Sequence, residues 1–283
     1  MASDTYFRAR LVATRDHSKV ITPKRILLCP VVLPSTGTDG QPNMKPCSRL
    51  VWIALALSVV IPALAQNSAS PYVYIRSNVN QPWGQATNED AMDSVFGAGN
   101  WTTLYFEDLT AETLFTASTQ FIFMEGGDTS FPSFRDFMQG NTNVATTWIQ
   151  NGGRLLIMCA PNDPLNGAFV NLPDNVVLQA DAFYNSAAST VRAVDLSNPI
   201  FSSPHSTTNN LNGDFVAHGY FTGGDVQILM KSNFNQTVLG MDVIGSGLMM
   251  FGGMTTDNFH LPQPAAHALL ENIIYYTAFT SLE

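Results

Sequence analysis

Basic side chains are scarce in this 283-residue chain and unevenly distributed along it. Before Gln66 there are eight Lys or Arg against three Asp, whereas from Gln66 onward five Lys or Arg stand against 19 Asp or Glu. Nucleic acids and anionic membranes are bound through clustered Lys and Arg. The part from Gln66 onward is therefore predicted not to bind nucleic acid, and its acidic balance is typical of a solvated surface.

Cysteine is scarce as well. Of the three cysteines, Cys29 and Cys47 precede Gln66, and only Cys159 follows it. A chain that begins at Gln66 can form no intrachain disulfide. Its stability must come from an ordinary hydrophobic core, which the 218 residues from Gln66 to Glu283 can supply in a single domain.

Motifs for nucleotides and metals are missing too. Neither Gly-x-Gly-x-x-Gly nor a P-loop occurs from Gln66 onward, which excludes nucleotide hydrolysis. The histidines show no His-x-His or His-x3-His spacing, so a zinc site is not expected. We expect neither a cofactor nor a metal in this protein.

Residues 44–65 have the three parts of a secretory signal peptide. A short basic stretch leads into the apolar run 50–61, which ends in Ala-Leu-Ala before Gln66. The run is shorter than the roughly 18–20 residues that a membrane-spanning helix needs. We therefore predict a secreted or periplasmic protein that begins at Gln66 and has no membrane span after cleavage; an uncleaved anchor or a buried helix is the alternative. Residues 1–43 are basic and unpatterned, and we expect them to be a disordered upstream extension.

From Tyr72 onward, short β-rich runs alternate with helical periods, which predicts one α/β domain over residues 66–283. The expected architecture is a three-layer, flavodoxin-like fold with a mainly parallel sheet, closed by a C-terminal β-hairpin around Gly245–Gly247 and a helix. Residues 162–212 have a looser pattern and are expected to form loops with edge pieces. The parallel strands are predicted at 72–75, 101–106, 121–124 and 155–158.

The loops that follow the third and fourth of these strands are the predicted site. An open α/β sheet binds ligands at the carboxyl ends of its strands. Here Glu125 and Asp128 bracket the Gly126-Gly127 turn, and Cys159 ends the next strand. We expect a crevice between the loops 125–130 and 159–163.

These residues resemble the class I glutamine amidotransferase-like superfamily, over roughly Tyr72 to Ala278. In that family a Gly-Gly loop supplies oxyanion-hole amides, and Gly126-Gly127 is similar to it. A helix then leads through a glycine to a strand that ends in the nucleophilic cysteine, as Gly152 and Cys159 do here. Where active members carry the catalytic histidine, however, this chain has Gly252-Gly253, and Pro161 replaces a glycine after the cysteine. The resemblance implies the fold and a degenerate, non-catalytic site.

Three functions fit this sequence. The favoured one is a secreted, non-catalytic binding or interaction module whose partner is a small molecule, a glycan or a protein. The second is a hydrolase with Cys159 as nucleophile, Gly126 and Gly127 as oxyanion loop and His260 as base. The weaker third is a carbohydrate-active accessory protein. The candidate ligand-binding residues are Glu125, Asp128, Asp163 and Trp83. Their side chains could hydrogen-bond a sugar or hold a cation, or they could simply form a solvated loop edge.

Overall fold

The computed structural model describes residues 70–162, 169–180 and 188–282. The predicted signal peptide, the upstream extension and Asp163 lie outside these residues. In the part of the chain that is described, no helix is both long enough and apolar enough to cross a membrane.

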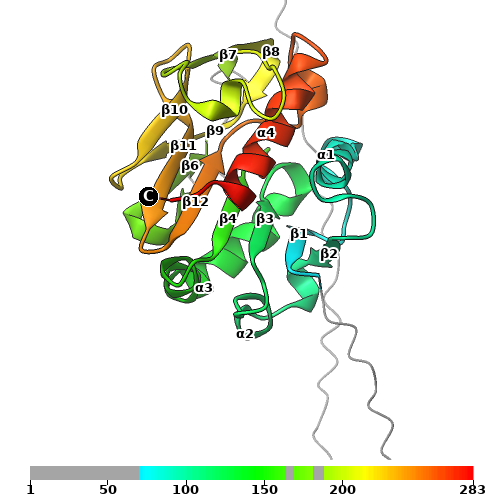
Figure 1. Ribbon diagram of the computed structural model, residues 1–283, viewed down its shortest axis with the longest axis vertical. Helices are drawn as coiled ribbons and strands as arrows, with labels where there is room; N and C mark the ends of the chain where they lie inside the picture. The colour runs from blue at the N-terminus through cyan, green and yellow to red at the C-terminus, as the bar shows by residue number, and fades with distance from the viewer. Residues whose placement is uncertain (1–69, 163–168, 181–187, 283) are drawn as a thin grey trace, which may run out of the picture. The chain divides into compact units, whose positions relative to one another are not determined.

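Twelve strands in the described ranges form one mixed sheet, with helices packed on it (Figure 1). The helices are α1 (Thr87–Phe96), α2 (Ala111–Leu114), α3 (Phe131–Gln150) and α4 (Ala265–Phe279). The strands are β1 (Tyr72–Arg76), β2 (Thr102–Tyr105), β3 (Phe121–Glu125), β4 (Arg154–Met158), β5 (Phe169–Asn171), β6 (Val177–Ala180), β7 (Ala188–Ala193), β8 (Asn210–Ala217), β9 (Gly219–Thr222), β10 (Gln227–Ser232), β11 (Thr237–Ile244) and β12 (Gly247–Gly252). The predicted α/β class is confirmed.

One half of the sheet is parallel, in the order β2-β1-β3-β4-β12. The predicted neighbours β3 and β4 pair in register from Phe121 opposite Arg154 to Glu125 opposite Met158, which confirms them as adjacent parallel strands. Both strands are almost entirely buried, as expected for the centre of a sheet that is covered on both faces. Because the two strands are parallel and paired in register, their carboxyl ends lie side by side.

The other half of the sheet is antiparallel. β12 pairs with β11, and β10, β7 and β8 continue the order, while β9 links β11 to β6 and β5. The expectation of loops with edge pieces over residues 162–212 was wrong for β7, which lies between β10 and β8 inside the sheet. β7 reads Ala-Ser-Thr-Val-Arg-Ala, and Val191 is its one large apolar side chain, so the apolar signal of a strand is weak.

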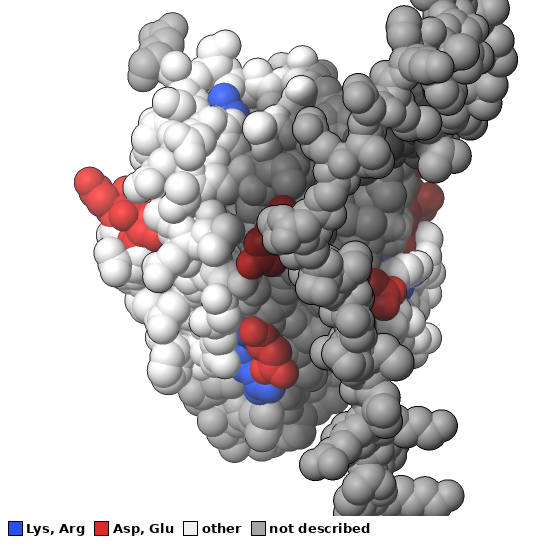
Figure 2. Space-filling view, turned by 90° about the horizontal axis from the view of Figure 1, so that it is seen from below, with Lys and Arg blue, Asp and Glu red and all other residues white. Residues whose placement is uncertain are grey.

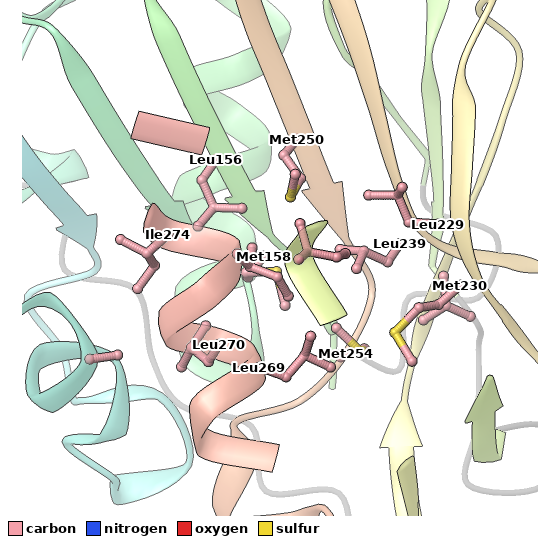
Figure 3. Close-up of a cluster of buried hydrophobic side chains, with 14 of the residues drawn as sticks. Leu156, Met158, Leu229, Met230, Leu239, Met250, Met254, Leu269, Leu270 and Ile274 are labelled. Carbon is pink, nitrogen blue, oxygen red and sulfur yellow. The ribbon is translucent and has the colours of Figure 1, made fainter. Parts of the chain in front are cut away.

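Two hydrophobic clusters lie on opposite faces of the parallel strands. Side chains alternate along each strand, so Tyr74, Phe123 and Leu156 face α1 and α4. Val73, Ile122 and Leu155 belong to the second cluster, with the apolar stripe of α3. Figure 3 shows part of the first cluster, in which Leu269 and Leu270 of α4 lie near Met158 and Met254.

Candidate functional site

The loops that follow β3 and β4 are joined to each other by backbone hydrogen bonds. The N–H of Gly126 donates to the carbonyl of Met158 at 2.8 Å, and the N–H of Asp128 donates to that of Ala160 at 3.2 Å. The two loops are thus bonded to each other where a crevice between them was expected. The structure nevertheless brings four of the predicted residues together here: Glu125, Gly126, Gly127 and Cys159.

The thiol of Cys159 is enclosed. The residue is 0% exposed, and its Sγ donates a hydrogen bond to the carbonyl of Gly126 at 3.0 Å. Burial, and secondarily the carboxyl of Glu125, raise the pKa of the thiol well above its ordinary value. Cys159 is therefore protonated at neutral pH and shielded from reagents.

Both predicted oxyanion donors are engaged within the protein. The N–H of Gly126 is bound to Met158, as described above, and the N–H of Gly127 donates to Oε1 of Glu125. An oxyanion hole needs donors that point to the place where a substrate oxygen develops charge. These two amides do not offer that arrangement.

His260 has partners other than the thiol. Its Nε2 lies 2.9 Å from Oγ1 of Thr255 and 3.2 Å from the carbonyl of Val216. Since that carbonyl can only accept, Nε2 carries the proton. Burial lowers the pKa of His260 to about 4, so the imidazole is neutral at physiological pH. Its observed role is to tie the segment after β12 to β8.

A small cavity opens at the carboxyl edge of the parallel strands, on the side of α1 and α4. Its volume is about 20 Å³, which is enough for about one water molecule. The apolar wall includes Met158, Met254, Leu269 and Leu270, which Figure 3 shows together. The polar lining consists of Asn88, Glu125, Thr255, Thr256, Asp257 and His260.

Glu125 places a buried carboxyl in this lining. The residue is 4% exposed, and its Oε2 accepts a hydrogen bond from Nδ2 of Asn88 at 2.6 Å. Burial raises the pKa of Glu125 to about 8, against the opposing effect of the Gly127 and Asn88 bonds. The carboxyl is thus mostly neutral at pH 7. Asn88 lies inside the first turn of α1 and binds both Glu125 and Tyr74.

Asp257 is the second buried carboxylate of the cavity, and no sequence pattern indicated its role. It is 5% exposed, and its Oδ2 lies 2.9 Å from Nδ1 of His267. That hydrogen bond is the largest influence on the pKa of His267 and raises it. Burial opposes this effect but is smaller. Among the described residues, Oδ1 of Asp257 has no hydrogen-bond partner. His267 follows Asp257 by ten positions, a spacing that matches no recognised motif.

An aromatic group lies on the same edge of the sheet. Trp83 adopts a positive φ of 57°, and its backbone N–H donates to Oδ2 of Asp128 at 3.0 Å. The indole ring makes edge contacts with His218 and Phe259, at centroid distances of 5.3 and 5.9 Å. Asp128, expected to bind a ligand, thus positions the turn that carries Trp83. Asp163 is outside the described residues.

No set of three or more His, Cys, Asp or Glu within the described ranges has a geometry that could hold a metal ion. The acidic side chains at the carboxyl edge are either neutral, as Glu125 is, or committed to a partner, as Asp128 and Oδ2 of Asp257 are. What the edge offers is a small polar cavity with aromatic rings nearby.

Comparisons with known proteins find distant similarities to solved structures. No family model matches the sequence, and no curated protein matches it. Among solved structures, the chain is similar to a protein assigned as a GMP synthase component from Thermoplasma acidophilum, with 8% identity, a TM-score of 0.45 and coverage of 72% of this chain and 92% of that one. It is also similar to a cytoplasmic protein from Salmonella typhimurium, with 12% identity, a TM-score of 0.45 and coverage of 74% and 99%.

A third similar structure is a protein assigned as ThuA-like from Parabacteroides merdae, with 9% identity, a TM-score of 0.39 and coverage of 73% and 88%. The first and third of these proteins have glutamine amidotransferase-like folds. At these identities and TM-scores, the likenesses carry no argument about the activity of this chain.

Proposed function

We propose that this protein is a secreted, non-catalytic binding module built on a glutamine amidotransferase-like fold. The strand order β2-β1-β3-β4-β12 supports the flavodoxin-like, three-layer assignment, because it corresponds to the order 2-1-3-4-5 of that fold. The α1/α4 pair and α3 supply the outer layers. The β11–β12 hairpin and α4 then close the domain.

One observation carries the non-catalytic assignment: every group that thiol chemistry would use is committed elsewhere. A nucleophilic cysteine needs a thiolate, a base within hydrogen-bond reach and free oxyanion donors. Here the thiol binds the Gly126 carbonyl, the Gly127 amide binds Glu125, and His260 binds Thr255 and Val216. Activation of Cys159 would require all of these contacts to rearrange.

The ligand site of the module is the cavity and its aromatic neighbours. It lies at the carboxyl edge of the parallel strands, where open α/β sheets bind ligands. Glu125, Asn88 and Asp257 line the cavity, and Trp83 is held at the same edge of the sheet by the bond from its N–H to Asp128. The basic side chains on the face shown in Figure 2 lie at separate points, which supports the exclusion of nucleic acid as a partner.

Alkylation of Cys159 separates this proposal from the hydrolase alternative. The native protein is treated with iodoacetamide between pH 5 and 9, and the modified cysteine is identified by peptide mass spectrometry, so that Cys29 and Cys47 are scored separately. Because the thiol is buried and protonated, we expect modification at least on the order of 100-fold slower than in guanidinium chloride. Fast alkylation of native protein near pH 6, lost in His260→Ala, would establish the hydrolase instead.

A further inference from the structure

The cavity at the carboxyl edge of the sheet admits nothing larger than water unless one of its walls moves. Its volume is about 20 Å³, which is enough for about one water molecule. Most of its lining residues belong to strands, to α1 or to α4. The exception is the segment that follows β12, which contributes Met254, Thr255, Thr256, Asp257 and His260. This segment is therefore the wall whose movement would open the cavity.

The segment is anchored near both ends but not in its middle. Near one end, Thr255 donates its N–H to the carbonyl of Val216 in β8 at 2.9 Å. Just past the other end, Leu261 and Asn212 of β8 exchange two backbone hydrogen bonds, of 2.8 and 3.0 Å. Between these anchors, within the described ranges, the 3-10 turn Asp257–Phe259 makes no backbone–backbone hydrogen bond to another strand or helix. The turn thus lies over the cavity between two fixed points.

Side chains hold this turn in place. The ring of Phe259 meets that of Trp83 at a centroid distance of 5.9 Å, and Nε2 of Gln263 donates to the carbonyl of Asp257 at 2.6 Å. A third contact comes from α4, where Nδ1 of His267 lies 2.9 Å from Oδ2 of Asp257. Of the three side chains that hold the turn, the imidazole is the one that changes its charge near neutral pH. His267 is thus the pH-sensitive contact.

The groups that face His267 favour its protonated form. Its Nδ1 faces Asp257, its Nε2 lies 3.6 Å from Oε1 of Glu271 on α4, and Asp90 of α1 is a third acidic neighbour. A carboxylate only accepts hydrogen bonds, and a neutral imidazole has a single N–H, so the imidazolium alone can donate towards both Asp257 and Glu271. Among the described residues, the other ion-pair partner of Glu271 is His205, at 3.3 Å, and no Lys or Arg pairs with either carboxylate.

Protonation of His267 therefore strengthens its hold on the turn. The bond to Asp257 raises the pKa of His267 above its ordinary 6.5, against the smaller opposing effect of burial. The stability that this contact contributes is complete below pH 6.5 and is lost as the pH rises through the raised pKa. The side chain is 30% exposed, so it exchanges protons with solvent. Acid tightens the contact, and base loosens it.

We propose that the turn Asp257–Phe259 is a lid on the cavity and that protonated His267 is its latch. When the imidazolium gives its proton to solvent, Asp257 keeps a neutral partner in place of a charged one, and the lid loosens. The cavity is thus closed most firmly in acid, and access to it increases as the pH rises. As control of access to a ligand site, the inference rests on the proposed binding function.

Hydrogen–deuterium exchange at pH 5.5, 7 and 8.5, read by peptide mass spectrometry, tests the latch. The reporters are the amides of Phe259 and His260, which donate to the carbonyls of Thr256 and Asp257 within the turn. Their protection is corrected for the intrinsic exchange rate at each pH. Because a charge-assisted hydrogen bond is roughly twice as strong as a neutral one, we expect the protection in wild type to fall about tenfold from pH 5.5 to 8.5.

Two variants separate the latch from other effects of pH. His267→Gln cannot become cationic, so the tenfold fall should be absent from its profile. The comparison with wild type is needed because Glu125, which also lines the cavity and has a pKa of about 8, is common to both proteins. The matched control is His205→Gln, which removes an imidazole that contacts Glu271 but not the lid. It should keep the wild-type fall.

Each other outcome overturns the inference. Protection that does not change with pH in wild type, or the same fall in His267→Gln as in wild type, would show that His267 is no latch. If His267→Gln does not fold, NMR of wild type decides: the Phe259 amide should titrate with the midpoint of the His267 ring, and a different midpoint refutes the latch. Failure of the latch with an unreactive Cys159 leaves the binding module standing, whereas a reactive Cys159 refutes that module and not the latch.

Discussion

The carboxyl of Glu125 should make the stability of this protein fall as the pH rises, and Glu125→Gln should remove that dependence. In the folded protein, burial raises the pKa of Glu125 from an ordinary 4.5 to about 8. Between pH 4.5 and about 8, the folded state therefore keeps a proton on this carboxyl that the unfolded state has already lost. Stability decreases wherever the folded state binds more protons than the unfolded state.

The expected magnitude follows from the size of the pKa shift. Each pKa unit corresponds to 1.36 kcal/mol, so a rise from 4.5 to about 8 amounts to about 5 kcal/mol. The stabilising effect is complete below pH 4.5 and is lost as the pH rises through 8. Glutamine carries no charge at either pH, so the side chain that replaces Glu125 in the variant cannot contribute to this loss.

Urea unfolding at pH 5, 6.5 and 8 measures the effect. The difference in the free energy of unfolding between Glu125→Gln and wild type should change by several kcal/mol, in favour of the variant, as the pH rises from 5 to 8. Other groups with shifted pKa values, such as His267 and Asp242, are common to both proteins and cancel in the difference. Glu112→Gln, at an exposed position, is the matched control and should show no such change. Parallel pH profiles for wild type and Glu125→Gln would refute a protonated, buried carboxyl.

Three further predictions concern single positions. N-terminal sequencing of exported protein should give a chain that starts at Gln66, and intact exported material that starts at Met1 would contradict the signal peptide. Gly152→Ala should destabilise the folded protein by about 1 kcal/mol because φ is +103° there. The control Gly140→Ala lies in the helical backbone of α3 with open space around it, and it should stabilise the protein by about 0.5–1 kcal/mol. Equal unfolding midpoints for the two variants would show that the backbone at Gly152 does not require glycine. Gly126→Ala should destabilise by about 1–3 kcal/mol, because its Cβ would lie 2.7 Å from both Sγ of Cys159 and the ring of Phe134; an unchanged urea midpoint would show that this loop can move.

Local pattern was sufficient for the four parallel strands before residue 160, but not for the parallel pairing of β12 with β4. β3 and β4 are short apolar runs, and α3 between them has a 3.6-residue apolar period that ends at Ile149, shortly before Gly152 with its positive φ. Each signal is complete within about 20 residues, so the sequence alone identified both strands and their helix. In the antiparallel half the signals were uneven: a hairpin around Gly245–Gly247 was expected, whereas β7 was not expected inside the sheet, because only two of its six residues are buried.

The candidate site was only partly accessible from the sequence. Glu125 was found because it follows a strand, and the position of a strand end is a local property. Asn88 and Asp257 were not, because they reach the cavity from segments that are 37 residues before Glu125 and 132 after it. Sequence patterns report neighbours along the chain, whereas the cavity depends on neighbours in space.

The α/β class and the adjacent parallel strands could both be predicted from the order of residues. Three properties of the site came from the folded protein instead: Cys159 is bonded to Gly126, Glu125 is neutral and Asp257 keeps one oxygen without a partner among the described residues. Secondary structure follows from periodicity within a segment, and a segment can be read by itself. The protonation and hydrogen bonding of a side chain depend on burial and partners, which exist only after distant segments have packed together.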